Sequence, residues 1–323
     1  MIALSTLCAI VPMVAMLAFV WWLDRYDREP VWLLAVTFMW GATGAILLGM
    51  IGSVVLLIPL SMFDPSATAI GAPVMVAPLI EEPAKALILL AVVLSRHFDN
   101  MTDGFVYGAA AGLGFGMTEN FLYFTSVAAE GEVGVWVTTV VIRTAFSAVM
   151  HAMATSVVGA CMGFARFRGP AAMIAAASAG LVVAMGIHAL WNGLITLDSF
   201  GNAQGLLFLA DLILLPMELA VIFVIFQACL WDEKRTIHTE LSAEAEQGLI
   251  PEGHPAILSS FRKRIRRNWL SAGVDHHAYV RAATQLAMRK CQARRATGPG
   301  GSYYKQQVDR LRDDVRRLLR PSQ

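Results

Sequence analysis

Long apolar stretches alternate with short polar segments along most of this 323-residue chain. A helix needs about 20 apolar residues to cross the hydrocarbon of a bilayer. Stretches of that length occur seven times before residue 232, so the pattern predicts seven membrane-spanning helices. The predicted spans cover residues 3–23, 31–60, 72–94, 104–127, 134–164, 170–197 and 205–231.

The basic residues between these spans predict how the helices are oriented. Arg25 and Arg28 follow the first span, Arg96 follows the third, and Arg166 and Arg168 follow the fifth. The loops after the second, fourth and sixth spans contain no Lys or Arg. Because positively charged loops remain in the cytoplasm, we expect a multi-pass protein of the cell membrane with its N-terminus outside and its C-terminus in the cytoplasm.

Composition and charge divide the chain in two. Hydrophobic residues make up 57% of it and charged residues only 15%, against about 25% in soluble domains. Up to Trp231 the chain has seven Lys/Arg and fourteen Asp/Glu, whereas from Asp232 onward it has eighteen and ten. We therefore predict an all-α fold: a polytopic membrane helix bundle of about seven spans (residues 1–231) and a small, basic, helical cytosolic region (residues 232–323).

The third predicted span contains three charged residues, Glu81, Glu82 and Lys85. One charged side chain at the centre of a bilayer costs roughly 3 kcal/mol, so such residues usually face a polar interior and serve a function. Glu81 and Lys85 are four residues apart, which places them on one helix face. A Glu–Lys pair that only fixes packing would account for one glutamate and leave the other without a partner.

Three further spans carry polar residues at a similar predicted depth. These residues are Glu119 and Asn120 in the fourth span, His151 in the fifth, and His188 and Asn192 in the sixth. At about 1.5 Å of rise per residue, the three carboxylates and His188 share a layer roughly 12–15 Å below the outer boundary, and His151 is expected a few residues deeper. We expect them to form one water-containing site within the membrane.

This set of residues allows more than one chemistry. Two adjacent carboxylates suit activation of water by a general base, and the amide of Asn192 could stabilise an oxyanion. Alternatively, Glu119, His151 and His188 could hold zinc and leave a fourth position for water. Glu119 needs a partner from another span, for which His151, His188 and Lys85 are candidates. Arg143 is a candidate partner for Asp211 or Glu218 in the seventh span.

Taken together, these motifs resemble the PrsW family of intramembrane proteases. The resemblance rests on Glu81-Glu82-x-x-Lys85, Phe115-x-x-x-Glu119, His151 and His188-x-x-x-Asn192, and it covers roughly residues 21–231. The related CAAX prenyl endopeptidases carry a similar Glu-Glu, Phe-x-x-x-His and His-x-x-x-Asn pattern. In this chain Glu119 stands where those enzymes have a histidine, so their mechanism does not transfer residue by residue.

The resemblance implies an endopeptidase that cuts a single-span membrane protein, as in the regulated intramembrane proteolysis of an anti-sigma factor. By analogy, Glu81 or Glu82 would activate water, and His188 and Asn192 would bind the oxyanion. Glu119 and His151 would orient these groups or hold a metal, with Lys85 and Asn120 in support. Two other hypotheses fit the residues: a proton-coupled transporter or channel, and a scaffold whose polar groups only join helices.

The C-terminal region begins where the apolar pattern ends. Its segment 261–270 is rich in Arg and Lys with apolar residues between them, which favours contact with anionic lipid at the inner leaflet. We do not expect nucleic-acid binding, because no recognition module accompanies the charges. A final helix is predicted, with an apolar stripe of Val308, Leu311, Val315, Leu318 and Leu319.

Overall fold

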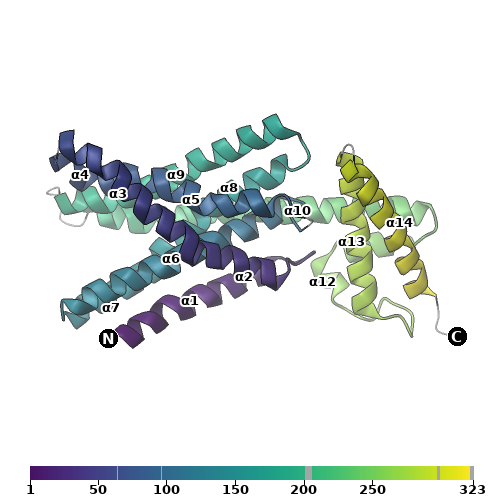
Figure 1. Ribbon diagram of the computed structural model, residues 1–323. Coiled ribbons are helices and arrows are strands. Elements are labelled where there is room, and N and C mark those ends of the chain that lie inside the picture. Colours follow the sequence, from purple (N-terminus) through teal and green to yellow (C-terminus); the bar gives the residue numbers. More distant parts are fainter. Residues whose placement is uncertain (64, 96, 201–205, 297–298, 321–323) are drawn as a thin grey trace. The chain divides into compact units, whose positions relative to one another are not determined.

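The computed structural model describes residues 1–63, 65–95, 97–200, 206–296 and 299–320, and the regular elements in this part of the chain are all helical (Figure 1). Three of them, η1 to η3, are π-helical segments continuous with α-helices. The elements are α1 (Ile2–Leu23), α2 (Val31–Trp40), η1 (Gly41–Ala45), α3 (Ile46–Phe63), α4 (Pro65–Gly71), η2 (Ala72–Val76), α5 (Ala77–Val92), α6 (Met101–Ala129), α7 (Val133–Ile142), η3 (Arg143–Ser147), α8 (Ala148–Ala165), α9 (Pro170–Phe200), α10 (Leu206–Glu246), α11 (His254–Leu258), α12 (Phe261–Arg264), α13 (His276–Arg295) and α14 (Pro299–Leu319).

The helices form two compact units. The first comprises Met1–Leu23 and Glu29–Phe226, and the second comprises Asp24–Arg28 together with the chain from Gln227 onward. The division falls inside α10, shortly before Trp231. The short loop Asp24–Arg28 groups with the second unit although it is far from it in sequence.

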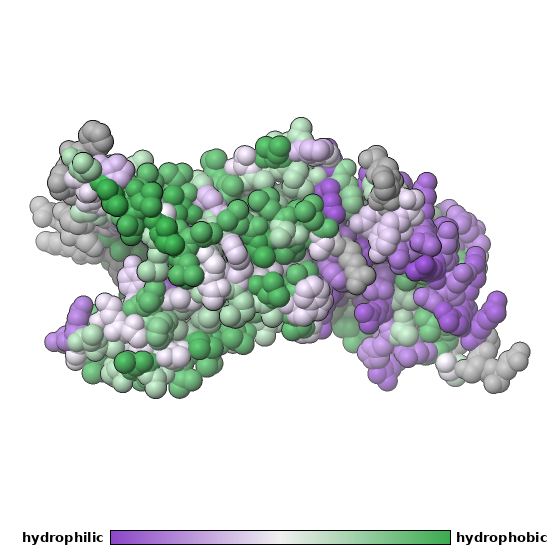
Figure 2. Space-filling view, viewed as in Figure 1, coloured by the Kyte–Doolittle hydropathy of each residue, from purple (hydrophilic) through white to green (hydrophobic). Residues whose placement is uncertain are grey.

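Four described helical segments are long and apolar enough to cross a membrane: Ile2–Leu23, Val31–Met62, Val133–Ala165 and Pro170–Asp198. They coincide with the first, second, fifth and sixth predicted spans. Nearly all large hydrophobic side chains that are exposed in the described residues lie at or before Trp231, and Figure 2 shows hydrophobic residues over much of the visible surface. The chain is therefore an all-α protein with membrane-spanning helices, and the other three predicted spans remain predictions.

Helix α6 forms the core of the first unit. It begins with a capping box, in which the side chain of Asn100 accepts hydrogen bonds from the backbone of Thr102 and Asp103, and Asp103 bonds back to the Asn100 N–H. From Thr102 to Gly116 every residue of α6 is buried. This burial is possible because small residues on two sides of α6 let neighbouring helices approach it closely.

Glycines every four residues allow α6 and α8 to approach each other closely. A β-carbon added to Gly104, Gly108 or Gly112 would overlap with backbone atoms of α8, and one on Gly116 would lie 3.2 Å from the Cα of Ala148. Small residues at this spacing let two membrane helices pack backbone to backbone. The contact brings the carbonyl of His151 against Gly112, which places the histidine beside α6.

Each π-helical segment receives a hydrogen bond from a polar side chain of another helix. Thr118 donates to the carbonyl of Ala42 in η1 at 2.8 Å, Asn192 to Pro73 in η2 at 2.8 Å, and Asn120 to Arg143 in η3 at 3.4 Å. A π-helical turn disturbs the regular hydrogen-bond ladder and is frequent near functional sites. In η2 the next π-type bond of Pro73 would come from Pro78, which has no N–H. Asn192 supplies the missing donor.

The second unit has a hydrophobic core of its own. Ile237, Leu241, Tyr279, Leu286 and Val315 are among its buried residues. The predicted stripe of the last helix faces this core: its valines are buried, and its leucines are partly buried against them.

Glu244 of α10 is also buried in this unit, where it accepts bonds from Lys290 of α13 at 2.6 Å and Arg312 of α14 at 2.7 Å. Burial raises the pKa of Glu244, but these two basic side chains lower it more.

The close contact between α6 and α8 leads to a prediction. We expect Gly112→Ala to destabilise the folded protein by about 1–3 kcal/mol or more, because the added methyl group would push the backbone of α8 away. Thermal unfolding of the full chain in detergent measures this loss. Gly186→Ala in α9 is the matched control, since a β-carbon there meets no atom within 4 Å. Equal effects of the two substitutions would contradict the packing account.

Candidate functional site: a buried acid–histidine cluster

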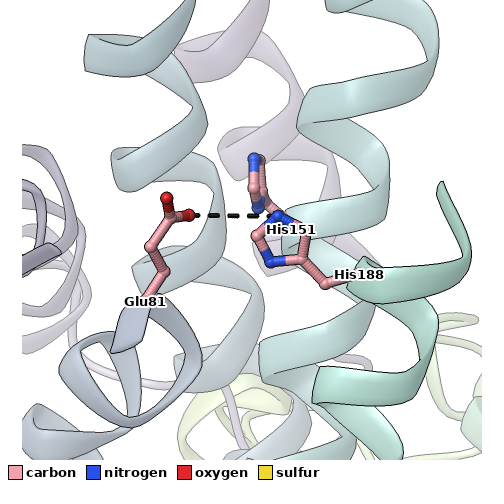
Figure 3. Close-up of side chains that lie close together, drawn as sticks. All are labelled: Glu81, His151 and His188. Atoms are coloured by element: carbon pink, nitrogen blue, oxygen red, sulfur yellow. Dashed lines mark ion pairs between the residues drawn. The ribbon is translucent and has the colours of Figure 1, made fainter. Parts of the chain in front are cut away.

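Four helices of the first unit contribute ionisable side chains to one cluster. α5 contributes both glutamates and a lysine, and α6, α8 and α9 contribute one residue each: Glu81, Glu82, Lys85, Glu119, His151 and His188. Figure 3 shows how Glu81, His151 and His188 point toward one another from separate helices. The side chains are almost fully buried, except that Glu81 and Glu119 keep 15% and 19% of their surface accessible.

The ammonium group of Lys85 lies at the centre of this cluster. Its Nζ is 2.7 Å from Glu82 Oε1, 2.9 Å from His151 Nδ1 and 3.7 Å from Glu81 Oε2. It also lies 4.0 Å from the centroid of the Phe115 ring, whose face attracts a cation. Spacings of three and four residues along α5 bring both glutamates to the same side of the helix as Lys85.

A second cation holds Glu119 at the edge of the cluster. Arg143 Nη2 and His151 Nε2 both lie 2.7 Å from Glu119 Oε2. Arg143 also donates from Nε to the side chain of Asn120 at 3.1 Å, and its guanidinium stacks on Tyr123 at 3.6 Å. These contacts fix Glu119 against His151 and occupy the carboxylate oxygen that faces the site.

The hydrogen-bond partners of each imidazole indicate which ring nitrogen carries a hydrogen. An ammonium group can only donate, so His151 Nδ1 accepts from Lys85, and His151 Nε2 therefore carries the hydrogen that Glu119 accepts. His188 Nδ1 lies 2.8 Å from Glu82 Oε1 and donates to it. The other nitrogen of His188, Nε2, faces Glu81 Oε2 at a distance of 4.0 Å.

Glu81 differs from the other two carboxylates because its oxygen without a hydrogen bond, Oε2, faces the second ring nitrogen of His188. Glu82 Oε1 accepts from both Lys85 and His188, and Glu119 Oε2 lies against Arg143 and His151. Glu82 Oε2 and Glu81 Oε2 are both buried and have no hydrogen-bond partner among the described residues, but Glu82 has no accessible side-chain surface, and it is Glu81 Oε2 that faces His188 Nε2. The 4.0 Å separation between this oxygen and His188 Nε2 allows one water molecule to contact both atoms, because hydrogen bonds of ordinary length reach it from each side.

The fixed charges of the cluster do not balance by themselves. Three carboxylates, those of Glu81, Glu82 and Glu119, face two cations, Lys85 and Arg143. Buried charges are stable only when they are paired. One further proton within the cluster would make it neutral, and the pair formed by Glu81 and His188 is where the contacts leave room for it.

The structure brings the predicted acidic and histidine residues together, and Lys85 with them. It gives two of the predicted residues other contacts: one N–H of the Asn192 amide is bound to Pro73, and Asn120 is bound to Arg143. Arg143 pairs with Glu119, whereas the sequence pattern suggested Asp211 or Glu218; the side chain of Asp211 lies outside the described residues. Arg143 is 23 residues from Asn120 in the sequence and lies on another helix, so only its charge within an apolar stretch could have indicated a role.

The fold and the site together define the class of this protein: a helical membrane protein with a buried cluster of carboxylates and histidines between its helices. A family model described as "PrsW family intramembrane metalloprotease" matches residues 29–227, which is more than half of the chain. The chain therefore belongs to the PrsW family of intramembrane proteases.

Two curated relatives are both named Protease PrsW. The protein from Clostridioides difficile (strain 630) is 34% identical over 121 residues, which cover 37% of this chain and 50% of that protein. The protein from Bacillus subtilis (strain 168) is 29% identical over 195 residues, which cover 58% of this chain and 80% of that protein. No solved structure matches the chain.

The family description raises the question of a metal ion. Glu81, His151 and His188 offer ligand atoms within 4.8 Å of one another, and one carboxylate with two imidazoles is a donor set that zinc accepts. However, Lys85 and Glu119 occupy the two ring nitrogens of His151 at 2.9 Å and 2.7 Å. The cluster as the structure describes it therefore does not fit a three-ligand metal centre, since the Lys85 ammonium stands where His151 would bind the ion.

Proposed function

We propose that this protein is an intramembrane endopeptidase in which Glu81 activates the hydrolytic water. The single observation that supports this choice is the position of Glu81 Oε2, which has no hydrogen-bond partner among the described residues and faces His188 Nε2 at 4.0 Å. Glu82 Oε2 also lacks a hydrogen bond, but the Glu82 side chain has no accessible surface, whereas Glu81 keeps 15%. Membership of a protease family makes hydrolysis of a peptide bond the most suitable reaction for such a group.

In the proposed reaction, water lies between Glu81 Oε2 and His188 Nε2. Glu81 takes a proton from the water while the water oxygen attacks the carbonyl carbon of the scissile bond. His188 carries the additional proton of the cluster, and Nε2–H donates to the developing oxyanion. The carbon–nitrogen bond then breaks, and Glu81 passes its proton to the leaving amine.

The remaining residues position these two groups. Glu82 accepts from His188 Nδ1 and holds the ring with Nε2 toward Glu81. Lys85 stabilises both carboxylates of α5, while Glu119 and Arg143 fix His151, which in turn accepts from Lys85. The second N–H of Asn192 is a further candidate donor to the oxyanion.

We further propose the topology that the sequence predicts: seven spans in the cell membrane, with residues 232–323 in the cytoplasm. The substrate would be a single-span membrane protein, as in regulated proteolysis of an anti-sigma factor. A site within the hydrocarbon layer suits a substrate that is itself embedded there, because the peptide bond reaches the water of the site without leaving the membrane.

The proposal predicts that Glu81→Gln reduces cleavage of a single-span substrate by at least roughly 1,000-fold, because the amide cannot accept the proton of water. The assay uses full-length protein in lipid nanodiscs and follows product formation on gels. Glu82→Gln should also abolish cleavage, and it should in addition lower the stability of the folded protein. Glu130→Gln, at an exposed position, is the control. Cleavage that persists in Glu81→Gln would contradict the role of Glu81, and cleavage that persists in both Glu81→Gln and Glu82→Gln would remove both residues from the reaction.

A metal centre is the second candidate for activating water, favoured by the proximity of Glu81, His151 and His188. A bound zinc ion would lower the pKa of its water and polarise the carbonyl group. The ammonium group of Lys85 occupies the position beside His151 Nδ1 that a zinc ion would need. We therefore predict substoichiometric zinc in the purified protein and a cleavage rate that a chelator changes by less than twofold. Stoichiometric zinc, with activity lost to the chelator and restored by added zinc, would contradict this prediction.

A proton-coupled transporter remains the alternative outside the protease class. Its physical basis is the continuous series of contacts from Arg143 through Glu119, His151, Lys85 and Glu82 to His188, since such series can conduct protons. Proton-linked uptake by reconstituted vesicles without proteolysis would favour it over the endopeptidase.

A further inference from the structure

A basic, acid-free segment stands out in the second unit. Between Glu252 and Asp275 the chain contains five Arg or Lys residues and no Asp or Glu. Three basic residues of α14 differ, because Arg312, Arg316 and Arg317 each lie within ion-pair distance of an aspartate three residues earlier. The positive charge of the segment is therefore not neutralised locally.

The folded segment exposes most of this charge on one short stretch. Arg262, Lys263 and Arg266 are exposed, and within the described part of the chain none of them makes an ion pair. Ile265 lies among them with 57% of its surface exposed. Only Ile265 and Tyr303 are exposed large hydrophobic residues among those described after Trp231. We call Arg262, Lys263, Ile265 and Arg266 the α12 basic surface.

Contacts within the second unit attach this surface to the loop Asp24–Arg28. Tyr26 donates from its hydroxyl to the carbonyl of Ser259 at 3.1 Å, and Arg264 donates to the carbonyl of Tyr26 at 3.3 Å. The guanidinium of Arg25 lies 5.3 Å from the centroid of the Phe261 ring. Arg264 thus makes its contacts within the second unit, whereas its neighbours Lys263 and Ile265 are exposed.

The loop itself is held near the membrane by the covalent chain. It joins Leu23, the last residue of one candidate span, to Val31, the first residue of the next. At no more than about 3.6 Å per residue, Tyr26 lies within roughly 11 Å of the end of α1. The segment around α12, which is hydrogen-bonded to this loop, is consequently close to the level of the lipid headgroups.

We propose that the α12 basic surface binds the anionic headgroups of the bilayer that holds the protein. Its basic side chains match the negative charge of phospholipid phosphates, and Ile265 can insert at the boundary between headgroups and acyl chains. The chain would then have a second attachment to the membrane beside its spans, which would hold the second unit against the inner leaflet. This proposal is independent of the proteolytic function.

The test measures lipid contact of this surface in the full chain. Asn268→Cys, at an exposed position beside the surface, carries a fluorophore, and headgroup-labelled quencher lipid reports contact in nanodiscs; protein without this cysteine gives the background. We expect quenching in discs with 30% phosphatidylglycerol, little in phosphatidylcholine discs, and a decrease at high salt. Replacing Arg262, Lys263 and Arg266 by Gln should lower the bound-to-free ratio roughly 100-fold.

The control removes three charges elsewhere: Arg310, Arg316 and Arg317 of α14, all exposed, are replaced by Gln. It should leave quenching unchanged. Equal quenching in both lipids, no loss in the α12 variant, or an equal loss in the control would overturn the proposal. Salt-sensitive retention of single-stranded RNA by the α12 surface, without lipid contact, would assign the surface to nucleic acid and also overturn it.

Discussion

The arrangement of the first unit depends on one buried cation. Lys85 has no accessible side-chain surface, and its ammonium lies within 2.9 Å of both Glu82 and His151. A buried charge that loses a partner destabilises a protein by about 3–5 kcal/mol, so α5 and α8 must keep the positions that supply those partners. Glu82 extends the constraint to α9 through His188, and His151 extends it to α6 through Glu119. One ammonium group thus couples four helices.

Two backbone features make this convergence possible. The glycines of α6 let α8 approach until the carbonyl of His151 lies against Gly112, which brings its ring within reach of both Glu119 and Lys85. The π-helical segments shift the register of the helices that carry Arg143 and the α5 carboxylates. Side chains from other helices then satisfy carbonyls in these segments, as Asn192 does for Pro73. Packing and hydrogen bonding together determine the position of each reactive group.

Much of this organisation could be predicted from the sequence, because hydropathy and helical spacing are local properties. They indicated an all-helical membrane protein, and the rarity of charge in apolar stretches indicated Glu81, Glu82, Glu119, His151 and His188. The partners of Arg143 and Asn192 could not be predicted. Both depend on π-helical segments and on rotations of whole helices, which sequence spacing does not determine.

The same limit applies to the grouping of Asp24–Arg28 with the second unit, since its contacts join residues more than 200 positions apart.

A double-mutant cycle between Lys85 and Glu82 tests the central claim most directly. The free energy of unfolding is measured in mixed micelles for the original protein, Lys85→Met, Glu82→Gln and the double variant. If the buried ion pair couples the helices, each single substitution costs about 3 kcal/mol or more, and the double variant loses at least about 2 kcal/mol less than the sum. Additive losses, within about 0.5 kcal/mol, would contradict the account.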